Sequence, residues 1–292
     1  MFNTATLILK SMHHNFIKNL LALFILMAFS GFAQQQDQVD LVWKVKDMIT
    51  YKTIMNQVRL PDTTEKPADT SFTGESDQFI RDFQEQAAKL KYITKLFKDN
   101  NGAIDIEVSA SINKSDTSTN VIAALAQINN SVILRGKLSP QGEILSFYYK
   151  TTQRNLIATL FELPPYPVKT NDSWSIDTNL LAMDQNYVAD SIYQKNNVFL
   201  ERIIEQDGDK IAVVKYDIEE YISGDFGPAF MTLVEETDDP IFMKMTYIAT
   251  GHFSINKGQW IDYSGTMALD SNFSLFGAGG NQITEFELLP LD

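Results

Sequence analysis

The chain has 292 residues, of which 44% are hydrophobic, and it carries 24 basic side chains, 37 acidic side chains and no cysteine. The formal net charge of −13 repels polyphosphate and anionic lipid, so composition argues against nucleic acid and anionic membrane surfaces as partners. The lack of cysteine excludes disulfides, thiolate metal sites and a lipid-modified cysteine anchor.

Residues 1–33 have the pattern of a secretory signal peptide. Two lysines precede the apolar run 20–29, and Gly31 and Ala33 are the small residues expected before a cleavage site. The run is too short for a comfortable membrane span, and no basic flank follows it. We therefore expect export to the periplasm or the extracellular space without a stable membrane span, whether translation starts at Met1 or at Met12.

Cleavage after residue 33 leaves 22 basic and 37 acidic side chains, a formal charge of −15. Residues 34–292 are long enough for one large β-rich domain or two smaller ones, and we predict a single domain. Apolar and polar residues alternate over 39–58, which predicts the first strands. Residues 60–74 are rich in Pro, Asp, Thr and Ser and predict a mobile loop, whereas helical spacing predicts a helix over 76–90.

Two hairpins and a second helix are predicted in the middle of the chain. The turn Asp99-Asn100-Asn101-Gly102 joins strand patterns over 92–97 and 104–112, and it lacks the alternating ligands of a calcium loop. Helical spacing recurs over 121–128. The turn Ser139-Pro140-Gln141-Gly142 then joins strand patterns over 131–138 and 143–149.

A rigid connector over 163–174 follows a predicted helix over 152–161. Pro164, Pro165 and Pro167 fix the backbone and remove three donors, so the run is neither helix interior nor central strand. Asn171 and Asp172 favour a left-handed turn that directs Trp174 and Ile176 into a core. We interpret Pro164, Pro167, Asp172 and Trp174 as structural residues; a proline-rich docking site is the functional alternative.

The back half of the chain has clear strand patterns over 186–206, 210–222, 241–255 and 260–273, with a last strand near 283–289. In the third of these, Met243, Tyr247 and Phe253 fall on one side and Lys244, Thr250 and His252 on the other, so one face is expected to be buried. In the fourth, Ile261, Tyr263, Met267 and Leu269 are predicted to point inward. The predicted class is α+β: a curved antiparallel sheet with a few short helices on one face.

The hairpin over 138–147 and the connector resemble a family of secreted bacterial proteins of unknown function. The sequences of that family look like a succession of three segments: a turn S/T-P-x-G-x-I/L, a helix, and then the motif LPxxPVxxGDxW. In this chain the motif reads LPPYPVKTNDSW, with Asn171 in place of the usual Gly. The resemblance implies a distant relation to LolA-like periplasmic half-barrel carriers, in which a curved sheet wraps around a few helices, and it carries over no catalytic residue.

Few residues suit catalysis or metal binding. His252 is the one histidine left after cleavage, and without partners in its own segment we interpret it as an ordinary surface residue. The acid doublets 219–220, 235–236 and 238–239 do not converge, because adjacent strand residues face opposite ways, and solvated loop charges are the favoured interpretation. The glycine-rich run 276–280 has no following Lys-Ser/Thr, so it predicts a turn and not a phosphate cradle. We expect no metal and no cofactor.

Methionines and aromatic residues in the back half suggest an apolar lining. The candidate ligand-binding residues are Phe226, Phe230, Met243, Met245, Tyr247 and Phe253. Simple packing beneath the helices is the alternative for the same residues. The sequence therefore leaves three hypotheses: an exported, non-enzymatic protein that binds a hydrophobic or lipid-like molecule, a structural protein that interacts with an envelope protein, or a carboxylate-dependent hydrolase.

Overall fold

A computed structural model describes residues 38–59, 91–111, 132–148, 154–181, 187–226, 240–272, 274–275, 278–279 and 281–291. Several predictions fall outside these residues: the signal peptide 1–33, the loop 60–74, the helices 76–90 and 121–128, and Phe230. No helix within the described ranges is both long and apolar enough to cross a membrane.

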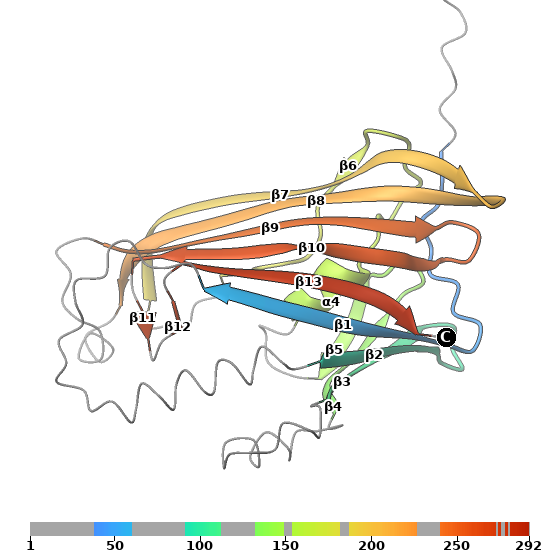
Figure 1. Cartoon of the computed structure of the whole chain (residues 1–292), viewed down its shortest axis with the longest axis horizontal. Helices are drawn as coiled ribbons and strands as arrows, with labels where there is room; N and C mark the ends of the chain where they lie inside the picture. Colours follow the sequence, from blue (N-terminus) through green and yellow to red (C-terminus); the bar gives the residue numbers. More distant parts are fainter. Residues whose placement is uncertain are drawn as a thin grey trace, which may run out of the picture. The chain divides into compact units, whose positions relative to one another are not determined.

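Within the described residues, eleven strands form one open antiparallel sheet, in the order β5-β4-β3-β2-β1-β13-β10-β9-β8-β7-β6 (Figure 1). The front strands are β1 (Met48–Arg59), β2 (Lys91–Lys98), β3 (Ile104–Ser111), β4 (Val132–Leu138), β5 (Ile144–Tyr148) and β6 (Ser173–Trp174). The back strands are β7 (Tyr187–Gln206), β8 (Asp209–Phe226), β9 (Ile241–Ser254), β10 (Gln259–Ser271) and β13 (Gln282–Leu291). β11 (Ser274–Leu275) and β12 (Ala278–Gly279) form a separate pair. The first strand of the chain pairs with the last, because β1 runs antiparallel to β13.

The predicted helices are the part of the fold class that the structure does not support as stated. Within the described residues there is one helix, α4 (Arg154–Phe161), where the pattern over 152–161 predicted it. The sheet itself is β-rich and antiparallel, as predicted.

One face of the sheet is buried and the other is largely polar, as the alternation predicts. Tyr247, Ala249 and Phe253 on β9 are nearly inaccessible, whereas Ile248 between them is 49% exposed. The prediction for β10 is wrong at its start, because the register shifts between Trp260 and Asp262. This bulge turns Trp260 inward, fully buried, and leaves Ile261 only partly buried.

The segment before β1 has the predicted alternation but is not a strand. Val39, Leu41, Trp43 and Val45 are buried while Asp40 and Lys44 are exposed. Its one ladder contact is an isolated bridge between Val39 and Val168 of the connector. The segment is therefore an extended strip laid against the core, because its backbone bonds to loops: Trp43 N donates to Pro140 O at 2.7 Å.

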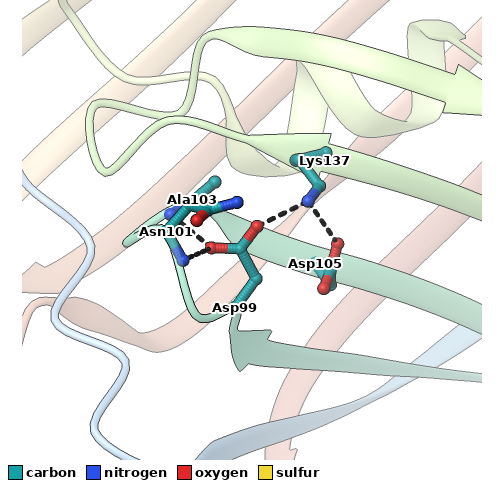
Figure 2. Close-up of polar contacts among 5 residues, drawn as sticks. All are labelled: Asp99, Asn101, Ala103, Asp105 and Lys137. Carbon is teal, nitrogen blue, oxygen red and sulfur yellow. Dashed lines mark hydrogen bonds and ion pairs between the residues drawn. The ribbon is translucent and has the colours of Figure 1, made fainter.

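The two hairpin turns predicted in the middle of the chain are confirmed, and β7 and β8 meet at a further turn of the same kind. Gly102, Gly142 and Gly208 all have positive φ, at 88°, 79° and 77°. In the β2–β3 turn, Asp99 Oδ1 accepts bonds from Asn101 N and Ala103 N (Figure 2). Lys137 of β4 reaches across to Asp99 at 2.5 Å and to Asp105 at 3.5 Å. The lysine bond is the largest cause that lowers the pKa of Asp99, so this turn is fastened to β4 by an ion pair.

The connector over 163–174 has the predicted geometry. Asn171 has φ of 72°, and the Asp172 carboxylate accepts from Lys169 N at 3.0 Å while Asp172 N donates to Lys169 O at 2.9 Å. Trp174 and Ile176 beyond the turn are 6% and 4% exposed. Pro164 is buried and Pro167 exposed, so this run ends α4 and re-aims the chain into the core.

Three aromatic side chains hold the C-terminal end of α4. Trp43 Nε1 donates to Phe161 O at 2.8 Å, Trp260 Nε1 to Leu160 O at 2.7 Å, and Tyr263 OH to Thr159 O at 2.8 Å. The last carbonyls of a helix have no intrahelical donors, and burial without a partner is costly. These donors, which we call the aromatic cap (Trp43, Trp260 and Tyr263), therefore let an eight-residue helix end inside the core.

Candidate binding cavities

The first cavity, which we call the methionine pocket, lies between α4 and the buried face of the sheet. Its volume is about 290 Å³. Apolar side chains make up most of the wall: Met55, Leu160, Leu180, Met245, Met267 and Phe286. The other lining residues are Thr53, Asn155, Thr159 and Tyr247. Three methionines from three different strands thus meet at one opening, and their unbranched thioethers adapt to irregular shapes.

The polar groups at this pocket are already engaged in hydrogen bonds. The Tyr247 hydroxyl lies 2.6 Å from the Tyr263 hydroxyl, which in turn donates to Thr159 O. Burial raises the pKa values of both tyrosines above the ordinary range, so both hydroxyls stay neutral at any physiological pH. The pocket therefore presents neutral hydroxyls and apolar surface.

The second cavity, the Glu220 pocket, lies over β7 and β8 and has a volume of about 470 Å³. Its polar lining residues are Thr178, Asn179, Tyr187, Tyr193, Gln194 and Glu220, and its apolar ones are Leu181, Ala189, Ile192 and Ile222. Glu220 is 5% exposed, and its carboxylate accepts from Leu181 N at 2.9 Å and from Gln194 Nε2 at 3.2 Å.

Residues 178–181 form the wall between the two pockets. Leu180 lines the methionine pocket, whereas Thr178, Asn179 and Leu181 line the Glu220 pocket. Asn155 of α4 fixes this wall from one side, because its side-chain oxygen accepts from Asn179 N at 2.8 Å and from Thr178 Oγ1 at 3.0 Å. Glu220 fixes it from the other side through Leu181 N.

The candidate lining residues from the sequence do not form one group. Met245 and Tyr247 line the methionine pocket. Met243 belongs to a small separate cluster with Leu181, Tyr187, Ile222 and Ile241. Phe253 is fully buried against Trp43 and Trp260, at ring distances of 5.4 and 5.1 Å.

Phe226 is the last residue of β8, and its side chain, like Phe230, lies outside the described part of the chain.

The interpretation of the 219–220 doublet as solvated loop charge is wrong for Glu220. The two acids do face opposite ways, as predicted: Glu219 pairs with Lys244 at 3.1 Å on the polar face. Glu220 continues the inward row of Tyr216, Ile218 and Ile222 and is buried. The sequence did contain a signal for this burial, because Glu220 occupies a position in the row of every second residue that is otherwise apolar. The other doublets, 235–236 and 238–239, lie outside the described residues.

His252 lies on the polar face, as predicted, but it has a partner on the neighbouring strand. Its Nδ1 is 2.6 Å from Asp262 Oδ1, and the two residues are opposite each other in the β9–β10 register. Among the residues that the structure describes, no group of three or more His, Cys, Asp or Glu is placed to hold a metal ion. The pair is therefore a cross-strand contact that stabilises the sheet.

The chain was compared with models of protein families, with curated proteins and with solved structures. None of the three comparisons finds a match. The interpretation of the two pockets therefore rests on their geometry in this structure.

Proposed function

We propose that this protein is an exported, non-enzymatic binding protein that holds a compact hydrophobic molecule in the methionine pocket. The observation that carries the proposal is the pocket itself, an apolar cavity between sheet and helix in which Met55, Met245 and Met267 converge. The leader over 1–33 supports export. In this proposal the sheet acts as a half-barrel of the LolA-like kind, with α4 on its buried face.

The volume of the methionine pocket limits the ligand. An apolar cavity of roughly 150 Å³ accepts benzene, so about 290 Å³ corresponds to a ligand of roughly ten carbon atoms. This size is near the lower end of ordinary ligand pockets, which start at roughly 300 Å³. A medium-length acyl or alkyl chain fits better than a full-length lipid with two chains.

A hydrolase is less well supported by the same geometry. Cleavage by paired carboxylates needs two acids roughly 5 to 10 Å apart in one cleft. Glu220 is the one acid among the lining residues of the two pockets. Neither pocket therefore supplies that pair from its own described walls.

The test combines retention with titration. Native mass spectrometry of the protein purified from its source under mild conditions should show a retained mass of a medium-chain lipid or similar molecule. Titration of the emptied protein with 1-octanol, followed by calorimetry, should give saturable binding that Met267→Asn weakens by about tenfold, because an amide is then buried against the ligand. Met48→Asn is the matched control, since Met48 is 58% exposed.

Two results would reject this function. One is the absence of saturable binding for neutral chains of eight to ten carbons, measured at roughly millimolar concentration because weak apolar ligands bind in that range. The other is equal binding by the Met267→Asn and Met48→Asn variants, which would mean that the ligand binds outside the methionine pocket.

A second candidate function rests on the edge of the sheet at β7. Val188, Ile192 and Tyr193 are 65%, 72% and 50% exposed, and β6 pairs only with residues 198 and 199 of this strand. An exposed apolar edge strand is a template for strand addition, so we propose an envelope protein as the alternative ligand. Crosslinking from a cysteine introduced at Ser191 should capture that protein, whereas a cysteine at Ser264 on the polar face should not.

A further inference from the structure

We propose that the Glu220 pocket is a second binding site, specific for an organic cation: a primary ammonium group carried on an apolar arm. The inference goes beyond the hydrophobic ligand of the methionine pocket, and it rests on different residues. It begins with a buried carboxylate that has no cationic partner among the residues that the structure describes.

Glu220 is 5% exposed and lines a cavity of about 470 Å³. Within the described part of the chain, its two hydrogen bonds come from neutral donors, Leu181 N and Gln194 Nε2. Among the described residues, no lysine, arginine or histidine forms an ion pair with it, whereas Glu219 beside it has Lys244. A buried charge is costly unless it is paired, so a cation that enters this pocket gains the missing partner.

The charges around the pocket favour a cation in the same way. Burial and then the negative charges of Asp225 and Asp190 raise the pKa of Tyr187, a lining residue, to about 12. The nearest lysine along β7, Lys195, is already bonded to Asp217 at 2.5 Å. The local potential is therefore negative, which attracts ammonium groups and repels carboxylates.

The rest of the lining suits an apolar arm. Ile192, Leu181 and Ile222 supply aliphatic surface beside the carboxylate. A free alkylamine and the side chain of a lysine share this chemistry.

The test uses three six-carbon probes that differ only in their head group: hexylammonium, 1-hexanol and hexanoate. We expect saturable binding of hexylammonium by calorimetry, weakened by salt because the contact is ionic. Hexanol and hexanoate should bind at least about tenfold more weakly, since neither supplies a charge-assisted bond to Glu220. Nα-acetyl-lysine methylamide should compete with hexylammonium if a lysine side chain is also accepted, and its failure to compete assigns the site to free amines.

The variants separate the carboxylate from general effects. Glu220→Gln should weaken hexylammonium binding by about tenfold, whereas Glu219→Gln, on the opposite face of the same strand, should leave it unchanged. Ile192→Lys should also abolish binding, because it supplies an internal ammonium group at the opening. Since Ile192 is 72% exposed, this variant should fold even if Glu220→Gln does not.

Equal affinities for hexanol and hexylammonium would overturn the proposal, as would unchanged hexylammonium binding in Ile192→Lys. The Met267→Asn variant should bind hexylammonium normally, so a failure of the methionine pocket and a failure of this site give different patterns.

Discussion

Gly251 is a position in the sheet where one added methyl group would meet two buried aromatic rings. A Cβ atom there would lie 2.6 Å from Trp260 Cζ3 and 2.7 Å from Tyr263 Cδ2. Both rings are fully buried, and both donate hydrogen bonds to the end of α4. Neither ring can move aside without breaking a bond of the aromatic cap.

The expected cost of Gly251→Ala follows from these contacts. Overpacking a core by one methyl group typically costs about 1 to 3 kcal/mol, and each hydrogen bond lost from a buried carbonyl costs about 1 kcal/mol more. We therefore expect a loss of about 3 kcal/mol in the free energy of unfolding. For a domain of this size the melting temperature should fall by roughly 6 to 12 °C.

Urea unfolding followed by tryptophan fluorescence measures this loss, because Trp43 and Trp260 report on the cap. Gly102→Ala is the control: its positive φ is unfavourable for alanine, unlike that of Gly251, but no atom lies within 4 Å of the new Cβ, so it should lose only about 1 kcal/mol. The double variant Gly251→Ala/Trp260→Phe should lose less free energy of unfolding than the sum of the losses in the two single variants. A Gly251→Ala protein within about 0.5 kcal/mol of wild type would refute the rigid cap.

Three further changes test other parts of the fold, each by urea unfolding. Asn171→Val should cost about 1 to 2 kcal/mol because a β-branched residue resists the positive φ, whereas Asn171→Gly should be nearly neutral; equal losses would contradict this. Lys137→Met should destabilise the protein near neutral pH. Because Lys137 lowers the pKa of Asp99 in the folded state, this stabilisation is present above the ordinary pKa of about 3.9 and is lost as the pH falls below it. The difference from wild type should therefore shrink below about pH 4, and a constant difference would contradict the ion pair. Trp43→Phe should cost about 1 to 3 kcal/mol, since Phe161 O then loses its buried donor, and an unchanged midpoint would show that the bond contributes nothing.

Local signals in the sequence were sufficient for the turns, the connector and the buried face. A glycine at positive φ, or Asn171 where the resembling motif has glycine, reflects the backbone of a single residue and needs no knowledge of distant contacts. Alternation in β8 and β9 likewise indicates which side chains are buried, whichever strands lie beside them.

The rest depends on contacts between distant segments. A bulge adds one residue to a strand and becomes visible only in the pairing, so the inward turn of Trp260 was missed. The segment before β1 alternates like a strand, yet it is buried by loops and does not join a ladder. Whether an inward side chain packs in the core or lines a pocket depends on which segments cover it. For this reason the sequence could not show that Phe253 packs in the core whereas Met245 lines a pocket.

The sequence predicted an apolar lining for a binding cavity, but it did not predict that there would be two separate pockets. The wall over 178–181 comes from the chain beyond the connector, and Asn155 and Glu220 hold it in place from opposite sides. Such polar side chains give no periodic signal of their own. A single acid in an inward row is the one feature that would have indicated the second pocket.

The pairing of β1 with β13 sets the order in which the chain can finish folding. Strand β1, residues 48–59, pairs with β2 on one side, and its other side is paired only when residues 282–291 are present. Until then the sheet consists of two separate parts, each with an unpaired edge strand. Contacts so far apart in sequence close slowly. A ribosomal product that stops short of residue 282 should therefore expose both edges at once and be removed by proteases or aggregate, although most of its strands have already been made.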